Sequence, residues 1–237
     1  MSSPAQPSGP KFVASVLRLE PRLAVFDCDG TLWSGDAGAD FFYWEIERGL
    51  LPREVAAWAL PRYDAYKAGQ VDEETMCGEM VTIHQGLSEA ELERAAEDFF
   101  REKVAMHIFP SMQELTMELV RRGCEIWAVS STNEWVVRAG ARRFGFRASH
   151  VLAASVEVVG GCATQRLRRV PTGEGKARVI RELLPPAPID AAFGNTVHDI
   201  AMLSLARHAF AISPDSALER LAHERGWTVY HPAAPAV

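Results

Sequence analysis

Residues 23–31, Leu-Ala-Val-Phe-Asp-Cys-Asp-Gly-Thr, decide how the rest of the chain is interpreted. Leu23–Phe26 is an apolar run that is too short for a helix and ends in a polar turn, which is typical of a buried strand. Asp27 and Asp29 follow at once, and their two carboxylates repel each other when both are ionised. Such a pair at a strand end indicates a bound cation, and Mg²⁺ suits oxygen ligands of this kind.

Further apolar runs of the same kind occur along the chain, at residues 125–129, 189–193, 208–212 and 227–230. Helical patterns separate them, over residues 111–122, 133–144, 174–184, 197–206 and 214–225. Alternation of strand and helix predicts a parallel sheet that is covered on both faces. Residues 156–164, with two glycines in the middle, predict a hairpin. The core is therefore expected to be a doubly wound α/β domain.

Residues 36–105 interrupt this alternation. Four segments in this stretch favour helix, at residues 40–48, 53–68, 72–84 and 89–106. Ser88 with Glu91, like Ser111 with Glu114 farther along, has the spacing of a capping box. We expect a helical-bundle cap, residues 36–105, inserted into a core of residues 12–35 and 106–237. Residues 1–11, rich in Ser and Pro, are expected to form a flexible tail.

The composition excludes several classes of protein. The chain has 237 residues and a formal net charge of −6, without the basic face that nucleic acids or anionic membranes attract. No run approaches the roughly 18 apolar residues that span a membrane, and the N-terminus lacks the apolar segment of a secretory signal. The 4 cysteines are scattered and form no metal-binding pair. We expect a cytoplasmic protein that binds neither nucleic acid nor membrane.

Polar side chains follow three of the predicted strands. Asp27 and Ser130 come directly after apolar runs, and Asn195 follows a third run after one glycine. Because ligands bind at the carboxyl ends of parallel strands, these side chains are expected to meet at one edge of the sheet. With Mg²⁺ and a phosphate bound there, one aspartate can attack phosphorus while the other transfers protons.

Four motifs resemble those of the haloacid dehalogenase-like (HAD) hydrolases, in the same order and with fitting spacing. They lie at residues 26–31, 128–131, 173–177 and 194–203. The resemblance extends over nearly the whole chain after residue 21, and the insert resembles the cap of the phosphoserine-phosphatase-like branch. It implies a Rossmann-like α/β core and a Mg²⁺-dependent phosphomonoester hydrolase that acts on a small phosphorylated metabolite through an aspartyl-phosphate.

The resemblance also implies a role for each motif residue. Asp27 would be the nucleophile and Asp29 the general acid and base. Asp36 stands where phosphoserine phosphatases contact the amino group of their substrate. The residues that bind the phosphoryl group would be Thr31, Ser130, Ser131 and Lys176. The residues at Mg²⁺ would be Asp27, Asp29 with its backbone carbonyl, Asn195, and Asp199 through a water.

Two departures from the family pattern keep alternatives open. The fourth motif usually begins Gly-Asp, whereas Asn195 supplies an oxygen without a charge. Cys77 aligns with a cap arginine that contacts the substrate carboxylate in phosphoserine phosphatases, so phosphoserine itself is disfavoured. A phosphotransferase is one alternative, and a non-catalytic phospholigand-binding protein is another because of Asn195. A dehalogenase is disfavoured because those relatives lack a second aspartate such as Asp29.

Two histidines are assigned structural roles, and the oligomeric state stays open. His198 is interpreted as a helix-surface residue, and His84 as exposed or packed. The oligomeric state is expected to be a monomer or a homodimer.

Overall fold

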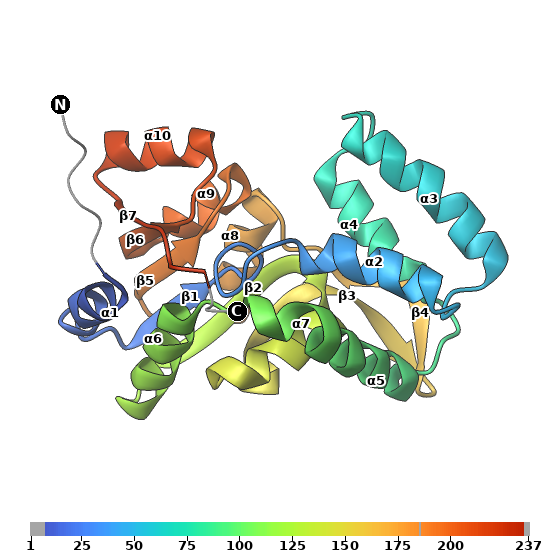
Figure 1. The fold of residues 1–237 in the computed structure, drawn as a ribbon, viewed down its shortest axis with the longest axis horizontal. Coiled ribbons are helices and arrows are strands. Elements are labelled where there is room, and N and C mark those ends of the chain that lie inside the picture. The colour runs from blue at the N-terminus through green and yellow to red at the C-terminus, as the bar shows by residue number, and fades with distance from the viewer. Residues whose placement is uncertain (1–7, 185, 235–237) are drawn as a thin grey trace.

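The computed structural model describes residues 8–184 and 186–234, and it has an α/β core with a group of helices at one end (Figure 1). Within these residues the strands are β1 (Leu23–Phe26), β2 (Glu125–Asn133), β3 (Val151–Val159), β4 (Cys162–Arg169), β5 (Ile189–Gly194), β6 (Ala206–Ile212) and β7 (Thr228–Tyr230). They form a 7-stranded sheet in the order β4-β3-β2-β1-β5-β6-β7. All neighbours pair in parallel except β3 and β4, which form an antiparallel hairpin. The predicted doubly wound α/β fold is confirmed.

Helices cover both faces of this sheet (Figure 1). The core helices are α1 (Gly9–Leu17), α6 (Pro110–Arg121), α7 (Glu134–Ala141), α8 (Glu174–Leu183), α9 (Ile200–Leu203) and α10 (Ser216–Arg225). Successive side chains of β1 point to opposite faces. Ala24 and Phe26 belong to the buried cluster that includes α1, α6 and α7, whereas Leu23 and Val25 belong to the cluster that includes α8, α9 and α10. This double burial explains why β1 is a continuous apolar run.

The register of β1 brings the predicted site residues to one edge. Phe26 lies opposite Ala128 of β2 and opposite Phe193 of β5. The residues just beyond these positions, including Asp27 and Ser130, therefore emerge side by side at the carboxyl ends of three adjacent strands.

Four helices lie between β1 and α6. They are α2 (Ala37–Glu47), α3 (Arg53–Lys67), α4 (Glu73–Thr82) and α5 (Glu89–Phe99), followed by a π-helical turn over 100–104 and a 3-10 turn over 105–107. Phe42, Tyr63 and Met76, from α2, α3 and α4, share a buried cluster of their own, whereas Phe99 of α5 belongs to the main core. The boundaries of the cap thus stay a prediction. Among the described helices, none is both long and apolar enough to cross a membrane.

The N-terminal segment differs from its expected conformation. Helix α1 begins at Gly9, so residues 9–11 of the predicted flexible tail are helical, while residues 1–7 lie outside the described part of the chain. Phe12 and Val16 on one side of this helix are fully buried, and the ring of Phe12 stacks on Tyr230 with centroids 3.8 Å apart. Burial of this apolar face holds the helix against the core.

Other local predictions also needed correction. Strand β3 begins at Val151, so its first half pairs with β2 and only its second half forms the predicted hairpin. Neither capping box is formed: α6 begins one residue before Ser111, and Ser88 precedes α5 without a side-chain hydrogen bond. The segment 197–206 holds only a 3-10 turn and the four-residue helix α9 before β6 begins.

Candidate active site

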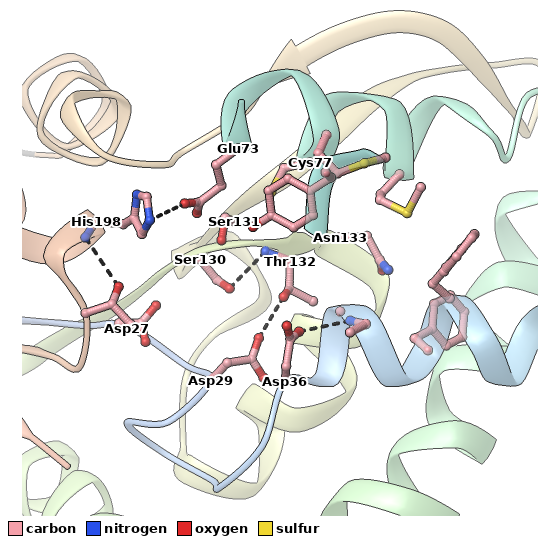
Figure 2. A pocket seen from close by; sticks show the side chains of 18 of the residues that line it. Asp27, Asp29, Asp36, Glu73, Cys77, Ser130, Ser131, Thr132, Asn133 and His198 are labelled. Atoms are coloured by element: carbon pink, nitrogen blue, oxygen red, sulfur yellow. Dashed lines mark hydrogen bonds and ion pairs between the residues drawn. The ribbon is translucent and has the colours of Figure 1, made fainter. Parts of the chain in front are cut away.

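A cavity of about 310 Å³ lies between the carboxyl ends of the central strands and the helices α2 and α4 (Figure 2). The predicted site residues that line it are Asp27, Asp29, Asp36, Ser130, Ser131, Lys176 and Asn195. Thr31 and Asp199 lie behind this layer and are almost fully buried. The structure therefore brings the predicted site residues together. Seven of them line the cavity, and Thr31 and Asp199 are buried behind them.

Asp27 is held from two sides. Its Oδ1 accepts a hydrogen bond from Lys176 Nζ at 2.6 Å, and its Oδ2 accepts one from Thr31 Oγ1 at 3.0 Å. Burial raises the pKa of Asp27 to about 7; the negative charge of Asp199 adds to this rise and Lys176 opposes it. The hydroxyl of Thr31 is thus used to orient Asp27.

Lys176 lies in the first turn of α8 and bridges two carboxylates. Its Nζ donates to Asp27 Oδ1 and to Asp199 Oδ1, each at 2.6 Å. Burial favours the neutral amine, but the two carboxylates outweigh this effect and raise the pKa of Lys176 above its ordinary value. The ammonium charge is therefore fixed beside Asp27.

Asp199 organises the loop after β5. Its Oδ2 accepts from the backbone N–H groups of Asn195 at 2.8 Å and of Thr196 at 3.0 Å. Gly194 permits this approach, because a Cβ there would lie 2.5 Å from the Cβ of Asp199. Both carboxylate oxygens are thus engaged by donors of the chain, and a role for Asp199 at a metal stays a prediction.

Asp29 points toward α2 and is surrounded by donors. Its Oδ1 accepts from Trp33 Nε1 at 2.6 Å and from the Ala37 N–H at 2.8 Å, and its Oδ2 accepts from Thr132 Oγ1 at 2.7 Å. Burial raises the pKa of Asp29 to about 6; the charge of Asp36 adds to the rise, and the hydrogen bonds oppose it. A carboxyl group with such a pKa both gives and takes a proton near neutral pH.

Asn195 lies directly against the turn that follows the two aspartates. Gly30 in that turn has φ +71°, and a Cβ there would fall 1.9 Å from Asn195 Nδ2, so only glycine fits. The Asp27 carboxylate and the Asn195 amide are oxygen donors that line this edge, and the Asp29 backbone carbonyl is the further donor that the family resemblance implies. Among the described residues no group of three or more His, Cys, Asp or Glu could hold a metal ion. Mg²⁺ does not require one, since it commonly takes one or two carboxylates, waters and phosphate oxygens, and this donor set fits it.

The cap contributes a carboxylate that sequence analysis did not identify. Glu73 of α4 forms an ion pair with His198, 2.6 Å between Oε2 and Nε2, and its Oε1 accepts from Thr172 Oγ1 at 2.6 Å (Figure 2). Both Glu73 and His198 line the cavity. His198 is at the surface as predicted, with 48% of its side chain exposed, but it also joins cap to core.

Comparison with known proteins identifies the family. The family model for haloacid dehalogenase-like hydrolases matches residues 24–204. The chain belongs to this family. The matched region begins in β1 and ends just after α9, so it includes every aspartate described above.

Relatives of this HAD hydrolase include named phosphatases. It is 29% identical over 220 residues to phosphoserine phosphatase SerB1 of Mycobacterium tuberculosis, covering 87% of this chain and 69% of that protein. It is 27% identical over 217 residues to a histidinol-phosphatase of Neisseria meningitidis, covering 87% and 97%. A crystal structure of a protein of unknown function from Bordetella pertussis matches with a TM-score of 0.75 and 24% identity, covering 89% and 98%, which shows the shared fold. The HAD hydrolase is thus an enzyme of the phosphatase type.

Three residues that position the site of this HAD hydrolase were missed at the sequence level: Trp33, Glu73 and Thr132. Thr132 could have been noticed, because it follows the second motif at the same strand end. Gly38 allows it to reach Asp29, since a Cβ at Gly38 would lie 2.9 Å from Thr132 Oγ1. Glu73 carries no such signal, because its partners Thr172 and His198 lie about a hundred or more positions away along the chain.

Proposed function

We propose that this HAD hydrolase is a Mg²⁺-dependent phosphomonoester hydrolase that acts on a small phosphorylated metabolite through an aspartyl-phosphate. The observation that carries the proposal is that two buried carboxylates, Asp27 and Asp29, line one cavity but have different hydrogen-bond partners. Asp27 is held by Lys176 and Thr31 at the cavity, while Asp29 is held by neutral donors and has a pKa of about 6. Carboxyl groups in such different environments suit the separate roles of nucleophile and acid.

In the first step a carboxylate oxygen of Asp27 attacks phosphorus, and the bond between phosphorus and the ester oxygen breaks. Asp29 gives its proton to that ester oxygen, so the substrate leaves as a neutral alcohol. In the second step a water oxygen attacks phosphorus while Asp29 takes a proton from the water. The bond between phosphorus and Asp27 then breaks, which releases inorganic phosphate and restores both aspartates.

The remaining residues stabilise charge during these steps. Lys176 presents a fixed ammonium group beside Asp27, where negative charge develops on the phosphoryl oxygens. Ser130 and Ser131 line the same side of the cavity and offer hydroxyl groups. When bound by Asp27, the Asp29 carbonyl and Asn195, Mg²⁺ would neutralise phosphate charge and favour ionised Asp27. A cytoplasmic location also belongs to this proposal, on the evidence of composition alone.

The proposal is tested by phosphate release from para-nitrophenyl phosphate in the presence of Mg²⁺ and in the presence of EDTA. We expect release that requires Mg²⁺, and a loss of release in Asp27→Asn, since an amide is a poor nucleophile. Asp64→Asn is the matched control, because Asp64 is an exposed residue of α3 that forms an ion pair with Lys67 of the same helix and does not line the cavity. Retention of more than a few per cent of activity by Asp27→Asn would overturn the aspartyl-phosphate mechanism.

The same assay separates the alternatives. A phosphotransferase would transfer the phosphoryl group to an added alcohol in preference to water. A phospholigand-binding protein would release no phosphate from any ester yet would be stabilised against unfolding by one.

A further inference from the structure

The cavity extends well beyond the phosphoryl end. Asp36 precedes the first residue of α2, and Glu45 lies near the end of the same helix; both line the cavity. Nine residues of helix span about 13 Å at 1.5 Å per residue. Phe41, Phe42 and Tyr63 line the walls between them. The alcohol part of the substrate therefore has room for a chain much longer than that of serine.

Positive charge is scarce in this cavity. Of the described residues that line it, Lys176 and His198 are the ones that can carry a positive charge. Lys176 is already shared between Asp27 and Asp199, and His198 is paired with Glu73. No lining cation is therefore left for a carboxylate group of the substrate.

Cys77 does not supply such a charge either. It lines the cavity from α4, and burial raises the pKa of its thiol to about 12, so the side chain stays neutral near pH 7. A substrate carboxylate would thus be repelled by Asp36 and would meet no lining cation that is free to pair with it, and leaving a charge unpaired in a partly buried site is costly.

The far end of the cavity carries a buried carboxylate with a fixed orientation. Glu45 is 1% exposed, and its Oε2 lies 2.7 Å from Nε2 of His84, which is fully buried. The other ring nitrogen of His84 lies 3.1 Å from the carbonyl oxygen of Val81. That oxygen can only accept a hydrogen bond, so Nδ1 carries a proton, and the contact of Nε2 with a carboxylate oxygen needs a second proton on the ring. The imidazolium of His84 then keeps Glu45 ionised while it contacts one of the two carboxylate oxygens. The pair therefore places an oriented carboxylate in the lining of the cavity, at the end away from Asp36.

We propose, resting on the proposed function, that the substrate is a phosphate monoester of an amino alcohol that carries positive charge on an extended chain and no carboxylate. Glu45 binds the positive group at the far end, and His84 is a positioning residue that holds Glu45. Asp36 at the cavity rim accepts a further ammonium or N–H group. Aromatic side chains along the walls pack against the intervening chain.

The test compares two synthetic esters of equal length, 8-aminooctyl phosphate and nonyl phosphate, together with O-phosphoserine. The wild-type protein is expected to show a kcat/KM for 8-aminooctyl phosphate at least about tenfold above that for nonyl phosphate, as a paired charge would give. O-phosphoserine should be a worse substrate than 8-aminooctyl phosphate. Absence of either preference overturns the proposal.

Variants of Glu45 and His84 test which residues determine the preference for the amine. Glu45→Gln should lower the preference for the amine at least about tenfold, mainly through KM, and His84→Gln should lower it in the same direction. Glu47→Gln is the matched control, since Glu47 is exposed on the same helix. A preference that survives in Glu45→Gln overturns the assignment of Glu45, and should that variant fold poorly, the wild-type ratios still decide.

The two proposals fail in different ways. Mg²⁺-dependent hydrolysis of nonyl phosphate without any preference for the amine overturns the substrate class and leaves the phosphatase function in place. Hydrolysis of none of the esters overturns the phosphatase function, and the substrate class with it.

Discussion

Glu73 of α4 and His198 of the loop after β5 are joined by an ion pair, with 2.6 Å between Oε2 and Nε2. Thr172, in the loop before α8, donates to the other oxygen of the same carboxylate. One side chain of α4 therefore connects two core loops at the edge of the cavity, and Figure 2 shows its contact with His198. Because these loops lead to Lys176 and Asn195, the position of α4 is tied to the phosphoryl end of the site.

Glu73→Gln should weaken this connection. We expect KM to rise by about three- to tenfold with a smaller fall in kcat, because a loosened cap holds the substrate less well. The free energy of unfolding should fall by no more than about 1 kcal/mol, since the pair is partly exposed to solvent. Steady-state kinetics and thermal unfolding measure the two effects.

Glu74→Gln provides the comparison for Glu73→Gln. Glu74 is the next residue of the helix and pairs with Arg178 at 3.4 Å, with both side chains largely exposed. Equal KM values for the two variants would show that the contact of Glu73 with His198 has no role in holding the cap.

Asp29→Asn should separate activity from stability. Activity should fall by about 10²–10⁴-fold, the usual scale for loss of a general acid and base. Stability should rise at pH 8, because burial raises the pKa of Asp29 from 3.8 to about 6 and the folded protein must then keep a buried charge. The amide can still accept from Trp33 and Ala37, so the fold should be retained.

The sign of the pH dependence follows from the raised pKa. A carboxyl group whose pKa is higher in the folded state contributes its stability below about pH 4, and this contribution is lost as the pH rises through about 6. Thermal unfolding in EDTA should therefore give a Tm difference in favour of Asp29→Asn at pH 8 that shrinks toward pH 4. A difference that grows on acidification would contradict the burial argument.

Cys77→Arg should change the selectivity of the cavity. Cys77 lines the cavity and lies near Ser131. An arginine there would pair with a substrate carboxylate, so kcat/KM for phosphoserine should rise by about tenfold relative to a neutral phosphomonoester. Cys77→Met, which adds length without charge, should leave the ratio unchanged. An unchanged ratio in Cys77→Arg would mean that this position does not contact the carboxylate.

The parts of the fold that were predictable are those specified by neighbouring residues. The apolar run before Asp27, the glycine in the turn that follows it and the polar residues after each strand are local patterns, and the parallel arrangement of strands then determines where they meet. Helix α1 was missed because Ser and Pro dominate the composition before Gly9, although its apolar side packs on Tyr230.

Contacts between distant segments could not be predicted from sequence. Thr132 reaches Asp29 across 103 positions, and Thr172 reaches Glu73 across 99. The first depends on the register of β1 against β2 and the second on how α4 is placed on the core, and no periodicity in the sequence specifies either. Local rules also failed where a stronger one competed: Pro110 takes the first turn of α6, which places Ser111 inside the helix and prevents its capping box.

Asn195→Asp should strengthen the binding of Mg²⁺. The Asn195 side chain lies against Gly30, the residue that follows Asp29, so a carboxylate there would lie beside the oxygen donors proposed for Mg²⁺. A charged ligand attracts a hard cation more than a neutral amide oxygen does, and the Mg²⁺ concentration for half-maximal activity should fall by about tenfold. The maximal rate should change less, because Asn195 takes no part in making or breaking bonds.

Two measurements and one control decide this prediction. A Mg²⁺ titration at saturating substrate gives the half-saturation point, and the rise of Tm with Mg²⁺ reports binding without turnover. Asn133→Asp is the control: Asn133 also lines the cavity, and it caps α7 by accepting from the Val136 N–H at 3.0 Å, a role that aspartate fills equally well. It adds the same charge away from the turn at Gly30, so a shift shared by both variants would reflect charge alone. If Asn195→Asp and the wild-type protein gave identical half-saturation points, Asn195 would not contact the metal, and the role at that strand end would pass to Asp199.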